Sequence, residues 1–141
     1  MMQQIGSRRQ QMSTSKIKEL ENRIKREGLK NIHLKELIGP DGYAKKIVEE
    51  AELTRVQLRK LFNEFKSIYQ QYQKGANADE IKVKLYQLYP LLQYQVNRNL
   101  IKNEEFKDLI FAILDKLDEN LEEFRVAMKF LEALIAYIKR D

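Results

Sequence analysis

Residues 54–72 read TRVQLRKLFNEFKSIYQQY, and this stretch gives the clearest indication of the fold. Thr54 and Gln57 have the spacing of a capping box, in which two side chains bind the free backbone N–H groups at a helix start. Behind them, apolar residues recur three and four positions apart, which places them on one face of an α-helix: Leu58, Leu61, Phe65, Ile68 and Tyr72. We therefore predict a long amphipathic helix that packs against a core.

Helical spacing continues on both sides of this stretch, and no segment shows the strict alternation of a half-buried strand. Caps predict a first helix from Ser13 or Ser15 to about Glu27, a helix over 43–53 capped by Asp41, and further helices that start near Asn77, Asn103 and Leu121. Pro90 should kink or break the helix after Asn77, because proline lacks an N–H and clashes with the preceding turn. The prediction is an all-α, single-domain helical bundle of about five to six helices over residues 1–141, with a flexible basic tail over residues 1–13.

The composition excludes several classes of protein. The 141 residues contain no cysteine, so disulfides, thiolate chemistry and zinc ribbons are ruled out. The longest apolar runs, 109–114 and 133–138, contain six residues each, whereas a transmembrane helix needs about 20. Residues 1–12 lack the apolar region of a signal peptide. We expect a soluble, cytoplasmic protein without a membrane partner.

Catalytic motifs are absent from the sequence. The single histidine, His33, has no metal-binding or triad motif around it, and no serine stands in a GxSxG setting. No glycine-rich phosphate loop occurs. The carboxylate pairs Asp118–Glu119 and Glu122–Glu123 are typical of a solvated helix face. We therefore predict that the chain is not an enzyme and has no catalytic residue, cofactor or metal site.

The net charge of +5 is unevenly distributed along the chain. Residues 1–102 carry 20 Lys and Arg against 11 Asp and Glu, whereas residues 103–141 carry 6 against 10. This polarity suggests one face for a polyanion and another for a basic partner. Ordinary variation between solvated helix faces explains the same numbers equally well.

Basic residues form a row on the predicted helix over 54–72. Arg55, Arg59 and Lys66 fall within about 40° of one another on a helix, whereas Lys60 points elsewhere. A row of this pitch can follow a phosphate backbone, although on spacing alone solubility charges are the simpler interpretation. Two further groups complete the candidates: the i, i+4 pair Arg98 and Lys102, and a tyrosine cluster in which Tyr72 is expected at the core edge while Tyr89 and Tyr94 stay open between core and base stacking.

Three stretches together resemble a known family. Residues 53–60 (LTRVQLRK) are similar to its Leu-Thr-x-Ser-Gln-Ile-Arg helix start. Residues 89–98 (YPLLQYQVNR) are similar to its Lys-Pro-Lys/Arg-x-Ala-Tyr-x-x-Gly-Arg segment, and residues 130–139 (FLEALIAYIK) to its closing Phe-Glu-Ala-x-Val-Ala-Tyr-x-Lys. Order, spacing and length agree over about residues 41–141. The chain thus resembles the small helical subunit of the type III-A CRISPR effector (Csm) complex, which serves antiviral defence.

The resemblance implies a non-catalytic bundle present in several copies. These copies stack beside the backbone subunits and contact the guide RNA and target RNA without reading sequence, while other Csm subunits carry out catalysis. Arg59 and Arg98 match the family motifs best, Arg55, Lys60 and Lys102 match less well, and Lys66 rests on helix geometry alone. Leu91 replaces a basic residue and Asn97 replaces glycine, but asparagine tolerates the left-handed turn that would end the helix there.

Three other functions fit parts of the sequence. The first is the small subunit of type III-B complexes, a similar bundle that sequence separates poorly from type III-A. The second is a helical dimer that acts as a protein-interaction adaptor without any nucleic acid. The third is a helix-turn-helix DNA-binding protein with a recognition helix from Thr54, which the length and core-facing stripe of that helix disfavour.

Overall fold

The computed structural model describes residues 15–98, 103–117 and 120–139. The predicted tail over residues 1–13, together with Lys102 and the pair Asp118–Glu119, lies outside them. The elements in chain order are α2 (Lys16–Glu27), the 3-10 turn η1 (Leu29–Asn31), α3 (Leu34–Ile38), α4 (Tyr43–Ala51), α5 (Arg55–Gln73), α6 (Ala78–Asn97), α7 (Glu104–Leu117) and α8 (Leu121–Tyr137). These described ranges contain no strand and six α-helices of nine or more residues, which confirms the all-α prediction.

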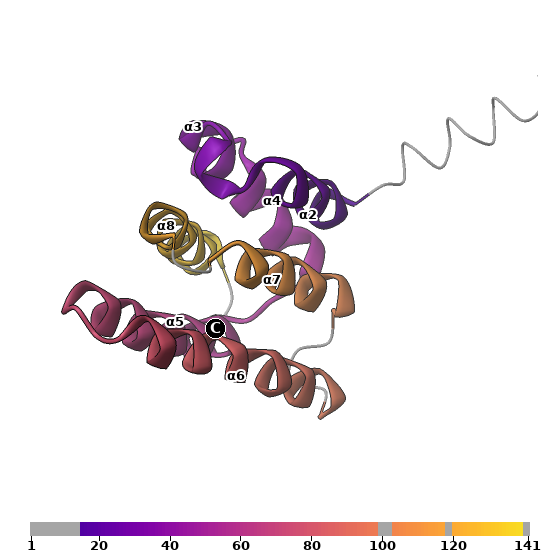
Figure 1. Cartoon of the computed structure of the whole chain (residues 1–141). Coiled ribbons are helices and arrows are strands. Elements are labelled where there is room, and N and C mark those ends of the chain that lie inside the picture. Colours follow the sequence, from indigo (N-terminus) through magenta and orange to yellow (C-terminus); the bar gives the residue numbers. More distant parts are fainter. Residues whose placement is uncertain (1–14, 99–102, 118–119, 140–141) are drawn as a thin grey trace, which may run out of the picture.

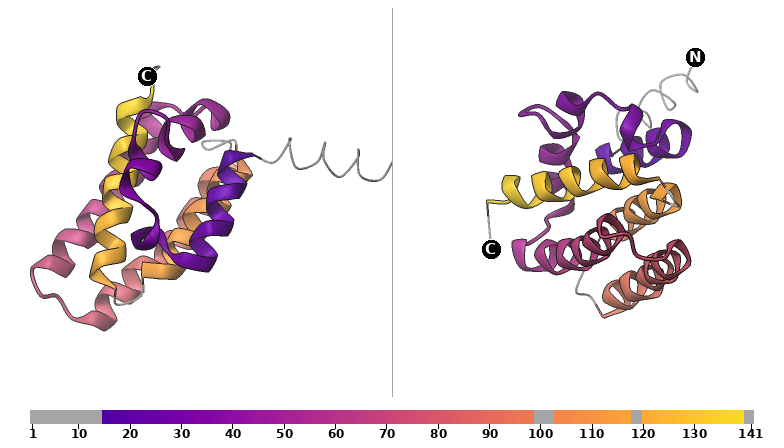
Figure 2. Two further views of the ribbon diagram at one scale, coloured as in Figure 1. Left: turned by 90° about the horizontal axis from the view of Figure 1, so that it is seen from above. Right: turned by 60° about the vertical axis from the view of Figure 1, so that its left-hand side comes forward.

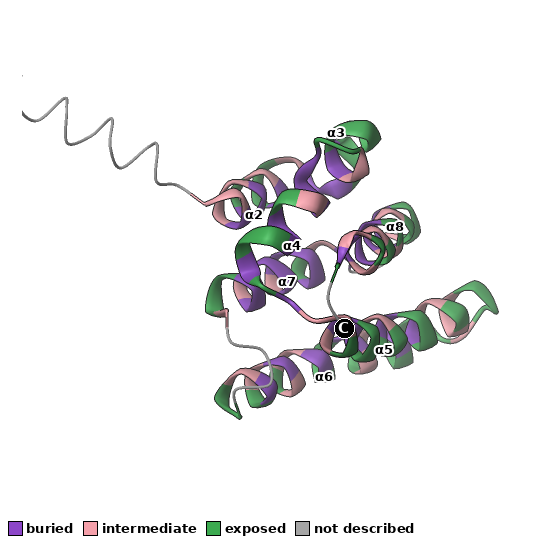
Figure 3. Ribbon diagram, turned by 180° about the vertical axis from the view of Figure 1, so that it is seen from behind, coloured by how far each residue is buried: buried purple, intermediate pink, exposed green. Residues whose placement is uncertain are grey.

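The helices form three layers (Figure 1). Helices α7 and α8 make the middle layer, with α2, α3 and α4 on one side and the α5–α6 hairpin on the other (Figure 2). Contacts of α2 with α7, α4 with α8, α5 with α8 and α6 with α7 join the layers. Helix α7 is largely buried, whereas exposed residues run along α5 and α6 (Figure 3). The hairpin therefore has one face on the core and one in solvent.

Aromatic side chains join α5 to α8 in the core. Phe65 and Phe124 are fully buried, and their ring centroids lie 6.4 Å apart in an edge-to-face arrangement. Tyr69 and Tyr72 also contact Phe124, at 5.0 and 6.1 Å between centroids. The predicted apolar stripe is confirmed, because Leu58, Leu61, Phe65 and Ile68 are buried and Tyr72 lies half-buried at the core edge.

Local sequence signals place most helix starts correctly. Gln57 N donates to Thr54 Oγ1 at 3.3 Å, and Thr54 N donates to Gln57 Oε1 at 3.1 Å, so both bonds of the capping box are present. Ser15 caps α2, and the side chains of Asn77 and Asn103 accept backbone N–H groups at the starts of α6 and α7. These caps fix where α5 begins and hence which side chains its outer face carries.

Two local predictions were wrong, and a third was wrong in part. Gly42 rather than Asp41 is the N-cap of α4, and that helix ends at Ala51 because Glu52 adopts the left-handed region at φ 52°. Of the kink or break predicted at Pro90, the break does not occur: α6 continues through Pro90, with its buried apolar face packed against α7 on either side. Asn97 is the last residue of α6, not a left-handed turn; among the described non-glycine residues only Glu52 has a positive φ.

Candidate nucleic-acid interface

The outer face of α5 carries three exposed cations, Arg59, Lys60 and Lys66. The buried stripe fixes the rotation of the helix. Arg59 and Lys66, two turns apart, therefore share the edge that faces α8, and Lys60 lies about 100° further round. Lys66 Nζ lies 5.8 Å from the centroid of the Phe62 ring. The row that the sequence predicts is thus present and reachable by solvent at Arg59 and Lys66.

Arg55 begins the same row but is held differently. Its side chain is half-buried, and Nη2 donates to the carbonyl oxygen of Ile138 at 2.7 Å. This bond joins the first turn of α5 to the residue that ends α8. The guanidinium therefore has a structural contact within the chain, and its predicted RNA contact would use its remaining donors.

The second predicted basic group lies at the end of α6 that is remote from the α5–α6 turn. The Arg98 guanidinium carbon lies 5.7 Å from the Tyr94 ring centroid, and both side chains are exposed. Tyr89 differs, because its hydroxyl donates to Asp115 and its ring packs edge-on against Phe111 at 5.0 Å. Tyr89 is therefore a core-edge residue, while Tyr94 and Arg98 offer a stacked aromatic–cation pair to solvent.

A groove of about 320 Å³ runs between α5 and α8 beside Lys66. Helix α8 adds Arg125 and Lys129, one turn apart, to the cations of α5. Arg125 Nη1 pairs with Glu122 at 2.7 Å, and a hydrogen bond with Tyr69 together with the Glu122 charge raises the pKa of Arg125. The full lining is Phe62, Lys66, Tyr69, Gln70, Gln73, Arg125, Met128, Lys129 and Glu132. Three cations and one carboxylate make this groove basic.

Comparison with protein families decides the assignment. The model described as Csm2 Type III-A matches residues 33–140. The chain belongs to the Csm2 type III-A family. It is therefore a small subunit of the type III-A Csm complex, as the three motifs suggested, and the match starts at His33, ahead of the motif-based start at residue 41. The comparisons with curated proteins and with solved structures found no match.

Sequence reasoning missed the α8 side of this candidate interface. Arg125 and Lys129 stand four residues apart on a predicted helix, which is the spacing that singled out Arg98 and Lys102. They lie within residues 103–141, which are acidic overall. The available signal was an i, i+4 pair of basic residues within an acidic segment. Side chains four residues apart share a helix face, so their local charge matters more than the net charge of the whole segment.

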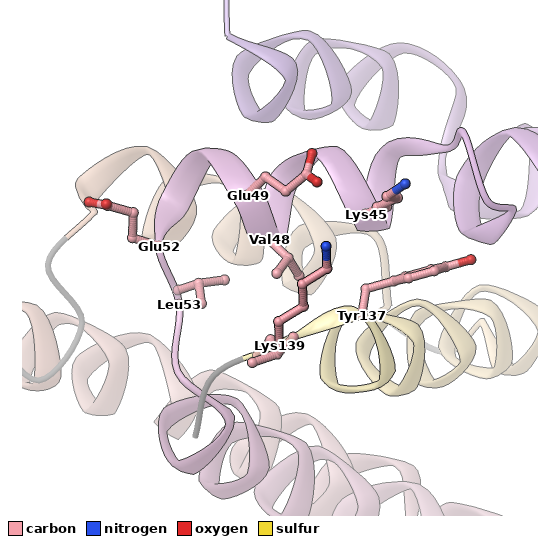
Figure 4. A pocket seen from close by; sticks show the side chains of 8 residues that line it. Lys45, Val48, Glu49, Glu52, Leu53, Tyr137 and Lys139 are labelled. Atoms are coloured by element: carbon pink, nitrogen blue, oxygen red, sulfur yellow. The ribbon is translucent and has the colours of Figure 1, made fainter.

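A second pocket of the Csm2 chain, about 260 Å³, contrasts with this groove. It lies between α4 and the end of α8, where Figure 4 shows Lys45 and Glu49 on α4, and Lys139 beside Val48. Its two lysines are offset by Glu49 and Glu52. The nearby Tyr137 hydroxyl donates to the carbonyl oxygen of Ile38 at 2.9 Å. The balance of charge gives this pocket no preference for a polyanion.

Metal-binding clusters and membrane-spanning helices are two further features that a chain of this kind can carry. Within residues 15–98, 103–117 and 120–139, no group of three or more His, Asp or Glu side chains is placed to hold a metal ion. No helix in those same ranges is long and apolar enough to cross a membrane. His33 is exposed at the start of α3 and makes no capping hydrogen bond there. The basic surface of α5, α6 and α8 is thus the leading candidate site.

Proposed function

We propose that this subunit contacts the backbones of guide RNA and target RNA in the Csm complex without reading their sequence. The observation that carries the proposal is the exposed cationic edge of α5 beside the basic groove. Among the described residues, no carboxylate pairs with Arg59 or Lys66. These two cations therefore break no ion pair within the described residues when they bind a phosphate.

Phosphate contacts release the counterions that condense on RNA. Affinity therefore falls steeply with salt and depends little on base sequence. One subunit makes few contacts, so its own dissociation constant should lie at or above the non-specific range of roughly 10⁻⁴–10⁻⁶ M. Several copies stacked along the duplex would raise the total through high effective concentration. Guide pairing would supply the specificity in this arrangement.

The remaining parts of the proposal follow from membership of a structural small-subunit family. We infer a non-catalytic role in the cytoplasm, with self-association as part of assembly. The site includes Arg55, Arg59, Lys60, Lys66, Arg98 and Lys102. Arg59 and Arg98 matter most, because both match the family motifs and are exposed.

The test replaces Arg59 and Arg98 with alanine in the reconstituted Csm complex. We expect normal assembly, weaker target-RNA binding, a shallower dependence on salt, and the same loss for every target sequence. The matched control is Arg26→Ala with Lys46→Ala, which removes two exposed cations from the α2–α4 layer. That control should leave RNA binding unchanged.

One outcome would favour the protein-interaction adaptor instead. If the Arg59→Ala, Arg98→Ala complex fails to assemble while the assembled fraction binds RNA normally, these arginines hold protein to protein. The backbone-contact proposal would then be wrong for them. Native mass spectrometry of the complex separates assembly from RNA binding in one measurement.

A further inference from the structure

The groove between α5 and α8 has two kinds of lining. Phe62, Tyr69 and Met128 are half-buried and pack against the core, so they form its floor. The other six lining residues are exposed and form its rim: Lys66, Gln70, Gln73, Arg125, Lys129 and Glu132. An apolar, largely aromatic floor below a rim of cations and amides suits a ligand with a flat ring and an anionic group.

The aromatic floor is held firmly in place. Tyr69 on α5 packs on the fully buried Phe124 of α8, with 5.0 Å between ring centroids. The two walls of the groove are therefore joined before any ligand arrives. The flexible Lys66 ammonium lies over the Phe62 ring and can move aside.

The rim matches the polar parts of a nucleotide. The side-chain amides of Gln70 and Gln73 each offer a donor and an acceptor, as the edges of RNA bases require. Lys66 and Lys129 approach from opposite helices and supply positive charge for a phosphate. The neutral pocket beside α4 has a similar volume but lacks this excess of cations.

We propose that this groove binds one unstacked nucleotide of single-stranded RNA. The base lies against Phe62 and Tyr69, and Lys66 and Lys129 bind the adjoining phosphates. The inference rests on the proposed function, because it takes RNA as the partner, but it adds a base contact to a backbone contact. Stacking on an aromatic ring tolerates any base, so the site remains independent of sequence.

The test compares two probes of equal charge that differ only in their bases. One is a uridine decamer, and the other is an abasic ribose-phosphate decamer, each titrated into the full chain at low salt by fluorescence anisotropy. We expect the base-bearing probe to bind about fivefold more tightly or better. Equal affinity of the two probes would overturn the base site.

Variants locate the preference in the groove. Phe62→Leu keeps an apolar side chain but removes the ring, so the preference for bases should shrink while the salt slope stays unchanged. Tyr86→Leu, an exposed tyrosine of α6, is the control and should keep the preference. Gln70→Glu places a carboxylate on the exposed rim without touching the core, and it should weaken both probes even if Phe62→Leu folds poorly.

Failure of the base site and failure of the backbone contact look different. Equal, strongly salt-dependent binding of both probes overturns the base site and keeps the proposed function. Binding of neither probe, with no salt dependence, overturns the proposed function itself. Tighter binding of a polyglutamate peptide of equal charge, lost in Phe62→Leu, would instead assign the groove to an acidic protein segment.

Discussion

Helices α2 and α5 both belong to the basic part of the chain but use their charges differently. On α2, Lys18 and Lys25 both bind Glu21, at 3.2 and 2.8 Å, and Arg23 binds Glu27 at 3.3 Å. On α5, Arg59 and Lys60 are exposed, and Glu64 is the single acidic residue from 55 to 73. Net charge therefore does not show which cations are free of ion pairs, whereas local pairing does.

The difference follows from charge order along each helix. On α2, opposite charges recur three and four residues apart, so neighbours pair on the helix surface. On α5, Arg55 and Arg59 stand four residues apart with no carboxylate between them, and Glu64 is the single acidic residue among four cations. We expect substitutions in the paired and buried regions to change stability and substitutions of the exposed α5 cations to change RNA binding.

The largest expected effect comes from the support beneath α5. Phe65→Ala removes a fully buried ring that contacts Phe124, and it should lower the free energy of unfolding by about 3–5 kcal/mol. Val56→Ala on the same helix, at a side chain that is 72% exposed, should change it by about 0.5 kcal/mol or less. Urea titrations followed by circular dichroism measure both. An unchanged midpoint for Phe65→Ala would mean that this stripe does not pack in the core.

The next effect comes from a buried charge that has a structural role. Glu123 is buried, and its carboxylate accepts the backbone N–H groups of Leu29 and Lys30 at the start of η1. Glu123→Ala leaves those two donors without that acceptor, which should cost about 1–3 kcal/mol. Glu122→Ala is the control, because its exposed side chain pairs only on the surface with Arg125. Equal losses for the two variants would contradict the assignment.

Glu122 and Glu123 also show where sequence reasoning stops. From the sequence both are expected on a solvated helix face, but the Glu123 carboxylate accepts a hydrogen bond from Leu29 N, 94 residues earlier in the chain. A carboxylate in that position also explains Gly28, since a Cβ there would come within 2.9 Å of Glu123 Oε1 and the residue has φ 79°. Such a contact depends on how helices pack, which no local pattern specifies.

Signals within one helical turn were predictable for the opposite reason. The capping box at Thr54 and the cap at Asn103 involve residues three apart, so the sequence alone places them. The continuity of α6 through Pro90 depends on its packing against α7. At the candidate site, residue spacing on α5 was enough to predict Arg59 and Lys66. The groove also requires residues of α8, and the packing of α8 beside α5 could not be predicted from either helix alone.

Lowering the pH should destabilise the ion pairs of α2 before it changes the exposed cations of α5. Burial alone would raise the pKa of Glu21, but hydrogen bonds from Lys25 and Lys18 outweigh it and leave the pKa below its ordinary value. Glu21 therefore adds stability that is present above pH about 4.3–4.5 and lost as pH falls through the lower folded-state pKa. Glu21→Gln should flatten this acid limb of unfolding free energy against pH. An acid limb of the same steepness in the variant would show that other carboxylates carry it.

The smallest effect separates two arginines four residues apart on α5. Arg55 donates to the carbonyl oxygen of Ile138, so Arg55→Ala should lower the free energy of unfolding by about 0.5–1.5 kcal/mol. Arg59 is exposed, and Arg59→Ala should change the free energy of unfolding by about 0.5 kcal/mol or less. In RNA binding we expect the reverse order, because the Arg59 side chain is exposed while the Arg55 guanidinium already donates to the Ile138 carbonyl oxygen. The slope of log affinity against log salt should fall by about 0.7–0.9 for Arg59→Ala and by less for Arg55→Ala. If the salt slope falls equally in both variants and neither variant is less stable, then Arg55 leaves the Ile138 carbonyl oxygen to bind RNA. The same side chain would then serve in both the structural and the binding role.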